Sequence, residues 1–327
     1  MGRLVDICWP ELGVTVVAEL NDTRNAALCE EFWQHLPFKV LQSHPVVSGE
    51  STYAWVPIVS VASVQHRARI VDCEIGAIRY SQGTGNKMSI QYGRGQEPVL
   101  QPILGQVLPE YVSFLPSVGK AVWDSLFWSK KLIFVEVRPH DAVLSPRSAD
   151  SAALPELAQK FLREAERVQL CEPEELRRIR RGEVRDTGSY GQYFTAWDFA
   201  NGMIRDYIVY CIYPLLKLAD TFTPQQIADV LDQTDPPYTD YLAYSGLATL
   251  RDFAEQLRAA VRSASSSADV KRLLVAFLRY GNRLNAWSHH YFPWHLGAFY
   301  GRVYDGQEFP GRAPDHGLAT AVAATSN

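Results

Sequence analysis

The first 140 residues alternate between short apolar segments and turn-forming residues. The apolar segments hold four to nine residues and are rich in valine, isoleucine and tyrosine, which favour strands, and glycines separate several of them. Short strands at this even spacing are typical of a barrel or sandwich rather than of an open parallel sheet. We therefore expect strands over residues 4–11, 14–21, 38–44, 51–59, 67–75, 77–82, 87–93 and 130–138.

One amphipathic helix is predicted among these strands. Asp22 is a suitable N-cap, and apolar residues recur at helical spacing from Ala26 to Trp33. The helix is expected to stop at Pro37, because proline lacks the backbone N–H that a helix interior needs.

From residue 151 onward the pattern changes to long helical periods, which predict an all-α bundle. Turn signals such as TDPP (234–237) and SASSSAD (263–269) separate the helical segments. The boundary is expected in the Pro-, Ser- and Asp-rich stretch 139–152, which divides the chain into domains 1–145 and 146–327, and the tail after Gly311 is expected to be frayed. The predicted helical segments are 154–170, 175–181, 197–220, 225–233, 238–262 and 268–292.

Composition places the chain among ordinary globular proteins. Hydrophobic residues make up 47% and charged residues 21% of 327 residues, a length that agrees with about two domains. The net charge of −4 argues against a nucleic-acid-binding protein, which usually has a basic domain. No apolar run approaches the roughly 20 residues that span a bilayer, and the N-terminus lacks a secretory signal. The five scattered cysteines contain no Cys-x-x-Cys pair, so we expect reduced thiols in a cytoplasmic protein.

Three motifs favour structural roles. The glycine-bearing stretches 81–89 and 91–98 lack the third glycine and the following helix of a dinucleotide-binding loop, so hairpin turns are the better interpretation. His289, His290 and His295 lack metal-ligand spacing and a neighbouring acid, which favours aromatic packing. The arginines between 177 and 185 follow glutamates at helical spacing, as on a solvated helix face.

The strands between residues 49 and 94 carry more functional groups than the packing of a small barrel needs. Alternation along a strand sends about half of them to each face, so a polar outer surface is one interpretation. The other is a lined pocket for a small polyacid, in which Lys and Arg hold carboxylates and a shielded Glu acts as a base. The groups are Glu50, Tyr53, Trp55, Arg67, Arg69, Asp72, Glu74, Arg79, Tyr80, Lys87, Ser89, Gln91, Tyr92 and Arg94.

The front half resembles the cyclophilin-like β-barrel family. The motifs that carry the resemblance are LPF (36–38), GESTYAWVP (49–57) and VDCEIGAIRYSQGTGNKMSIQYG (71–93), in this order and spacing. A closed barrel of this kind followed by an all-α domain is similar to the cucumopine/mikimopine synthases, a class of opine synthase. The resemblance implies an α+β protein of two domains, with the charged and aromatic groups lining the inside of the barrel.

The same resemblance implies an activity. The family joins the amine of L-histidine to the keto group of 2-oxoglutarate, and the imidazole then closes onto the imine in a Pictet–Spengler condensation that needs no nicotinamide or other cofactor. An acid must protonate the carbinolamine and a base must remove the ring proton. The expected catalytic residues are Glu50 (ranked ahead of Glu74), Glu74, Tyr53 and Tyr92, and the expected substrate-binding residues are Lys87, Arg69, Arg79, Arg94, Tyr80 and Ser89.

Two other functions stay open at this point. The barrel could hold a small ligand without catalysis, or it could act as a prolyl isomerase, which only the name of the fold supports. The expected partners are small molecules and a second copy of the chain, with no nucleic acid, membrane or metal. Aromatic residues are frequent in the helical half, where they could form the core, cover the barrel mouth or form a dimer interface.

Overall fold

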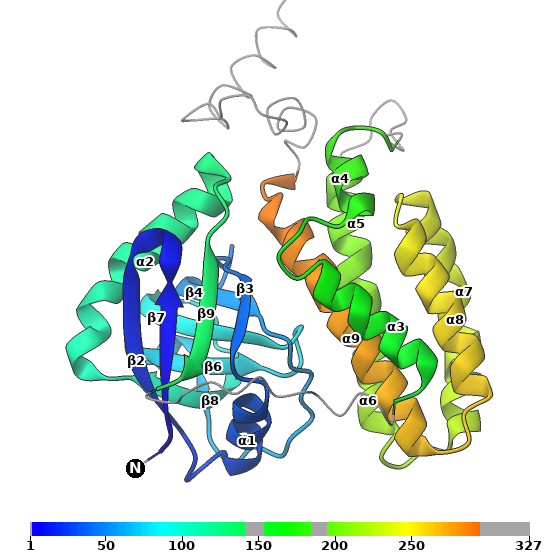
Figure 1. Cartoon of the computed structure of the whole chain (residues 1–327), viewed down its shortest axis with the longest axis horizontal. Helices are drawn as coiled ribbons and strands as arrows, with labels where there is room; N and C mark the ends of the chain where they lie inside the picture. Colours follow the sequence, from blue (N-terminus) through cyan, green and yellow to red (C-terminus); the bar gives the residue numbers. More distant parts are fainter. Residues whose placement is uncertain (1, 141–153, 185–194, 295–327) are drawn as a thin grey trace, which may run out of the picture.

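The chain folds into a strand-rich part followed by a helical part that lies beside it (Figure 1). A computed structural model describes residues 2–140, 154–184 and 195–294. The predicted boundary between residues 145 and 146 and the tail after Gly311 lie outside these ranges. No helix in the described ranges is long and apolar enough to cross a membrane.

The strands form one antiparallel sheet whose order is β3-β9-β1-β2-β8-β6-β7-β4, with β5 paired to β8. The expected closed barrel is not supported. Among the described residues, the backbone pairing between the segment that follows β3 and β4 is a single isolated bridge between Ser43 and Tyr53, so no ladder closes the sheet. The strands are β1 (Leu4–Trp9), β2 (Val14–Leu20), β3 (Phe38–Leu41), β4 (Gly49–Trp55), β5 (Arg67–Arg69), β6 (Ala77–Ser81), β7 (Lys87–Gly95), β8 (Leu100–Val107) and β9 (Phe134–Pro139).

One face of the sheet carries an aliphatic and aromatic core. Ala54 of β4, Ile78 and Tyr80 of β6, and Met88 and Ile90 of β7 belong to this core. Side chains of α1 (Ala26–Gln34) and α2 (Leu115–Asp124) complete it. Because neighbouring residues of a strand point to opposite faces, the residues between these core positions are left for the other face of the sheet.

The described part of the second half contains helices and no strand, as predicted. The predicted turn at TDPP is wrong: TDPP does not separate two helices, because α7 continues through Pro236 and Pro237. Asp235 is buried there and accepts a hydrogen bond from the Tyr207 hydroxyl, so tertiary packing prevails over the local helix-breaking tendency of proline. The predicted helix 238–262 is instead divided between Tyr244 and Ala248. The helices are α3 (Glu156–Arg167), α4 (Glu174–Arg180), α5 (Ala196–Arg205), α6 (Tyr213–Leu218), α7 (Pro224–Tyr244), α8 (Ala248–Arg262) and α9 (Ser267–His290).

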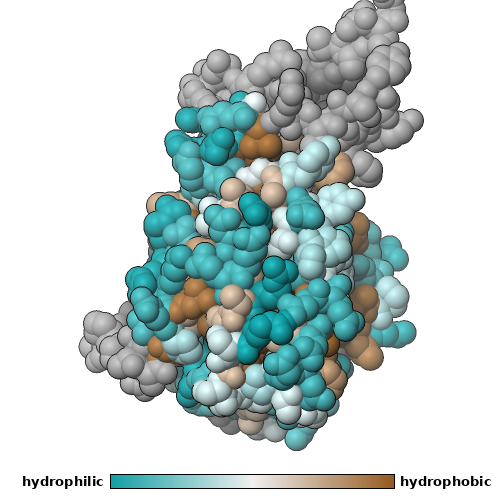
Figure 2. Space-filling view, turned by 90° about the vertical axis from the view of Figure 1, so that its right-hand side faces the viewer, coloured by the Kyte–Doolittle hydropathy of each residue, from teal (hydrophilic) through white to brown (hydrophobic). Residues whose placement is uncertain are grey.

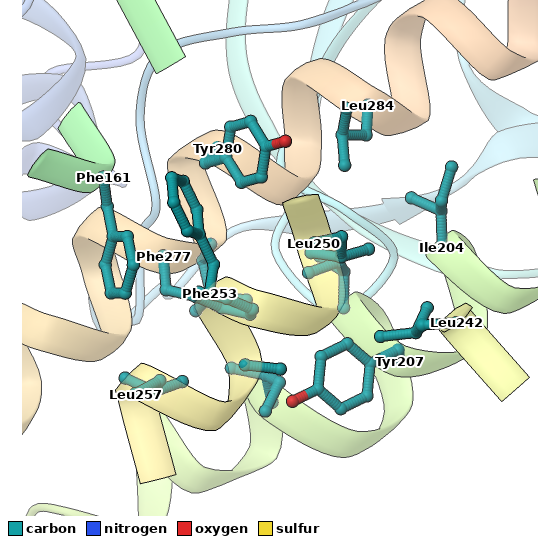
Figure 3. Close-up of a cluster of buried hydrophobic side chains, with 14 of the residues drawn as sticks. Phe161, Ile204, Tyr207, Leu242, Leu250, Phe253, Leu257, Phe277, Tyr280 and Leu284 are labelled. Atoms are coloured by element: carbon teal, nitrogen blue, oxygen red, sulfur yellow. The ribbon is translucent and has the colours of Figure 1, made fainter. Parts of the chain in front are cut away.

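Aromatic rings form the centre of the bundle core (Figure 3). Phe161 of α3 lies 5.0 Å from Phe253 of α8 and 5.4 Å from Phe277 of α9, measured between ring centroids. The outward face on the side of α7 and α8 is mainly hydrophilic, with small separate hydrophobic patches (Figure 2). The helices are thus amphipathic, with apolar faces directed toward the bundle interior.

Helix α9 joins the bundle to the sheet. It lies between the sheet and the other helices and contacts β4 (Figure 1). Arg283 of α9 is buried and donates hydrogen bonds from Nη2 to the carbonyl oxygens of Trp55 and Val56. Tyr213 of α6 donates to the Ser60 carbonyl at 2.7 Å. These bonds fix the helical part against the face of the sheet that the aliphatic core leaves free.

A buried carboxyl group in the bundle makes a pH-dependent contribution to stability. Glu175 accepts hydrogen bonds from the backbone N–H groups of Thr249 and Leu250, at the start of α8, and from the Tyr280 hydroxyl. Burial raises the pKa of Glu175 from 4.5 to about 7. The folded protein therefore binds a proton that the unfolded chain releases, and stability falls as the pH rises from about 4.5 to about 7.

Glu175→Gln is expected to remove this dependence, because glutamine stays neutral and keeps an oxygen acceptor. Melting temperatures measured from pH 4.5 to pH 8 should show a smaller decline for the variant than for the wild type, equivalent to a few kcal/mol at most. Exposed Glu174→Gln, one residue away, serves as the control and should decline like the wild type. Identical declines for all three proteins would assign the effect to other groups.

Candidate active site

A cavity of about 270 Å³ lies between the free face of the sheet and the helical part. Strands β4, β6, β7 and β8 contribute to one wall, and α5, α9 and the π-helix Asp206–Ile212 form the other. The strand residues in the wall are Ser51, Tyr53, Trp55, Arg79, Ser81, Lys87, Ser89 and Gln101, and the residues from α5, the π-helix and α9 are Asn201, Arg205, Val209, Tyr210, Asn285 and His289. The site is therefore outside the sheet's aliphatic core, not inside a barrel as expected.

The strand register orders the polar groups in rows across the sheet. Ser89 of β7 pairs with Tyr53 on one side and with Arg79 on the other. Lys87 pairs with Trp55 and with Ser81, two residues further along each strand. Since side chains two residues apart share a face, both rows point to the cavity. This brings together four of the predicted site residues, Tyr53, Arg79, Lys87 and Ser89.

Arg79 supplies a buried positive charge that has no counter-ion among the described residues. Its side chain is 1% exposed, and Nη2 donates to Gln91 Oε1 at 2.9 Å. Within the described residues, Nε and Nη1 have no hydrogen-bond partner and no carboxylate lies within ion-pair distance. Burial lowers the pKa of Arg79. A buried guanidinium with unpaired donors is costly, and an anionic ligand in the adjoining cavity would offset that cost.

Lys87 lies against two aromatic rings in the same wall. Its Nζ is 4.8 Å from the ring centroid of Tyr53 and 5.1 Å from that of Trp55. Burial lowers the pKa of Lys87 to about 8, against the opposing effect of the negative charge on Glu97. A fraction of this amine is therefore neutral near physiological pH, unlike an ordinary surface lysine.

Glu97 is the carboxylate of the site. Among the described residues it is the single Asp or Glu that lines the cavity, and it accepts a hydrogen bond from the Ser48 hydroxyl. It follows β7 in the connection to β8, where no strand alternation assigns it a face. Sequence analysis therefore missed it, although its position close behind the polar strands was a usable signal.

Tyr53, Trp55 and His289 form an aromatic wall. The Tyr53 hydroxyl lies 2.7 Å from His289 Nε2, and the ring centroids of His289 and Trp55 are 5.4 Å apart. Burial lowers the pKa of His289 to about 3, so its imidazole is neutral. His289 Nε2 also lies 3.1 Å from the His44 carbonyl oxygen, which can only accept a hydrogen bond, so Nε2 carries the proton.

The structure does not bring the other predicted residues to the cavity. Glu50, Glu74, Arg69 and Arg94 are exposed. Arg69 forms an ion pair with Asp72, and the Glu50 carboxylate accepts a hydrogen bond from the Arg94 backbone. These positions lie at strand ends and in loops, or on the opposite face from Tyr53.

Two predicted tyrosines also lie on the opposite face of the sheet. Tyr80 donates to the Ile58 carbonyl at 2.9 Å within the aliphatic core. The Tyr92 hydroxyl lies 2.7 Å from His44 Nε2, and burial raises the pKa of Tyr92 to about 12. Both are one residue out of phase with the residues that line the cavity, which is why they do not reach it.

The described residues hold no group of three or more His, Cys, Asp and Glu that could bind a metal. His289 and His290 are buried, which agrees with the predicted packing role. His295 lies outside the described residues. The aromatic residues of the bundle have two roles: Tyr207 and Trp287 lie in its core, whereas Tyr210 and Trp294 line the cavity.

Comparisons with known proteins found similarity to one family model and to solved structures. A solved structure of McbB in complex with tryptophan superposes with a TM-score of 0.80 and 28% identity, over 90% of this chain and 99% of the McbB chain. The solution structure of the hypothetical protein AF2241 from Archaeoglobus fulgidus gives a TM-score of 0.30 at 11% identity, over 42% of this chain and 95% of that one. No curated protein matches the chain. Residues 154–291 match the family model of the cucumopine synthase C-terminal helical bundle domain. The helical part of the chain is therefore similar to the cucumopine synthase C-terminal helical bundle domain, which confirms the resemblance found in the sequence.

Proposed function

We propose that the protein is a Pictet–Spengler-type synthase that condenses L-histidine with 2-oxoglutarate without a nicotinamide cofactor. The observation that carries the proposal is the cavity, in which, among the described residues, the buried and unpaired charge of Arg79 lies near one carboxylate, Glu97, and a neutralisable amine, Lys87. Two comparisons support the proposal. Residues 154–291 match the cucumopine synthase C-terminal helical bundle domain, and the chain is similar to McbB, which was solved with tryptophan bound.

The first stage of the reaction requires an anchored oxo acid. Arg79 is suited to hold the carboxylate beside the keto group, because guanidinium groups bind carboxylates through two parallel hydrogen bonds. Lys87 and Arg205 are the further cations of the described cavity wall for the remaining carboxylates. The amine of the amino acid then attacks the keto carbon, and one water leaves as the imine forms. Tyr53 faces this space and is a suitable donor for the departing oxygen.

The second stage joins two carbons and releases a proton. The imidazole carbon of the substrate attacks the imine carbon, and the ring regains aromaticity when a base removes the proton at the new bond. Glu97 is the candidate base, since it is the carboxylate available in the described cavity. Tyr53 and Trp55 offer faces on which the substrate ring can stack, and holding both reactants together supplies much of the rate through effective molarity.

The product assay tests this proposal. Purified protein with L-histidine and 2-oxoglutarate, and without any nicotinamide, is expected to yield a product whose mass is the sum of both substrates less one water. L-tryptophan is the second candidate amino acid, because McbB was solved with tryptophan. The two amino acids are compared at equal concentration by mass spectrometry, with boiled protein as the control for spontaneous condensation.

A binding protein without activity predicts a different outcome. A melting temperature that rises with 2-oxoglutarate, with no product from either amino acid, would replace the synthase by a small-molecule binder. Product that forms only at the rate of the boiled control would likewise show that the protein does not catalyse the condensation.

A further inference from the structure

We propose that Lys87 is a covalent catalytic residue, whose amine forms an imine with the oxo acid before the amino acid displaces it. This rests on the proposed function only in taking a 2-oxo acid as substrate. The lysine imine would replace a neutral ketone by a more electrophilic iminium, the form that amine nucleophiles attack most readily.

The first argument is the position of Lys87 relative to Arg79. Lys87 is one row away from the row that holds Tyr53, Ser89 and Arg79, and its Nζ is 4.8 Å from the Tyr53 ring centroid. The amine thus lies against a residue of the Arg79 row. In a 2-oxo acid the keto carbon is bonded directly to the carboxylate carbon. A carboxylate held by Arg79 therefore places the keto group in the part of the cavity that Lys87 borders.

The second argument is that the Lys87 amine has no hydrogen-bond or ion-pair partner among the described residues. No carboxylate lies within ion-pair distance of Lys87 Nζ in the part of the chain that the structure describes, and no hydrogen bond is made by this atom there. Other lysines differ: Lys39 pairs with Glu136 at 2.7 Å, and Lys130 donates to the carbonyl oxygens of Leu126, His290 and Phe292. Lys87 has aromatic faces instead, and burial lowers its pKa, so the neutral nucleophile is accessible.

The chemical steps balance without any further reactant. The Lys87 amine adds to the keto carbon, the carbinolamine loses its oxygen as one water, and a C=N bond to Nζ remains. The amine of the amino acid then adds to the same carbon, and the bond to Nζ breaks as a proton moves to the departing lysine. Lys87 returns to its starting state, and the total release is still one water per product.

Reductive trapping tests the proposal on the whole protein. The protein is incubated with 2-oxoglutarate and sodium borohydride in the absence of amino acid, and the intact mass and a peptide map are measured. We expect one reduced oxo-acid adduct, located at Lys87. Lys87→Arg keeps the positive charge but cannot form an imine, so it should lose the adduct, and its kcat should fall by more than ~10-fold with a smaller change in the oxo-acid KM. Lys39→Arg is the matched control at a paired surface lysine and should retain the adduct at Lys87 and the wild-type kcat.

The outcomes separate this inference from the proposed function. Condensation product without a trapped adduct in the wild type overturns the covalent role of Lys87 and leaves the synthase intact. An adduct at Lys87 without product from histidine or tryptophan supports the covalent role and overturns the proposed condensation. An adduct that persists in Lys87→Arg would come from another lysine and would also overturn the inference. The wild-type measurement stands even if the arginine variant melts at a lower temperature.

Discussion

Glu97→Gln is expected to lower kcat by about 10²-fold or more, which is the low end of what a general base contributes. Glutamine is nearly isosteric, and its amide oxygen can still accept the hydrogen bond from Ser48, so the loop between β7 and β8 should keep its conformation. What the variant loses is the ability to take up a proton. Product formation measured by mass spectrometry gives kcat, and the melting temperature is expected to change by no more than a few degrees.

The matched control for Glu97 is Glu50→Gln. The family resemblance ranks Glu50 first as the base, but its carboxylate is exposed and accepts a hydrogen bond from the Arg94 backbone, away from the cavity. Glu50→Gln should therefore turn over at nearly the wild-type rate. If Glu50→Gln loses activity and Glu97→Gln keeps it, the base has been assigned to the wrong face of the sheet.

Strand alternation accounts for the part of the site that sequence analysis found. Tyr53, Arg79, Lys87 and Ser89 lie at positions of equal phase in β4, β6 and β7, so a correct strand assignment places them on one face. The same rule separates Tyr80 and Tyr92 from them, but only once it is known which face bears the core. Periodicity divides the residues of a strand between the two faces of the sheet, but it does not show which face the helical part will cover.

The remaining groups depend on tertiary structure. Glu97 lies in an aperiodic connection, and His289 is 236 residues away from Tyr53 in sequence, yet the two side chains are hydrogen-bonding neighbours. The open sheet has a related cause: short, evenly spaced strands are compatible with a barrel, but closure requires a ladder between β3 and β4 that the described residues do not form. Local patterns carry no information about such long-range contacts.

A site between two parts of the chain also gives the helical part a role. The strands supply Arg79 and Lys87, whereas α5 and α9 supply Asn201, Asn285 and His289 and enclose the space above them. Ligand sites commonly form at such interfaces, because two surfaces can enclose a substrate that one sheet face would leave in water. The strand-rich part alone would expose Arg79 and Lys87 to solvent and lose the desolvation that lowers the pKa of both.

Arg79→Met is expected to weaken binding of 2-oxoglutarate by about 10²-fold or more, since truncating one partner of a buried hydrogen-bonded charge pair costs roughly 2–5 kcal/mol. The folded protein without ligand should lose little stability. Methionine fills a similar volume, and it removes two buried nitrogens, Nε and Nη1, that have no partner among the described residues, which compensates for the lost hydrogen bond to Gln91.

Melting temperatures with and without 2-oxoglutarate separate the loss of binding from a loss of stability. Wild-type protein titrated with 2-oxoglutarate should show a rising melting temperature, because a ligand that binds the folded state stabilises it by mass action. Arg79→Met should start within a few degrees of the wild type and show almost no rise. Arg79→Lys should lie between the two, because an ammonium keeps the charge but cannot make the bidentate contact. If Arg79→Met responds to the oxo acid like the wild type, the buried guanidinium is a structural charge and the carboxylate binds elsewhere in the cavity.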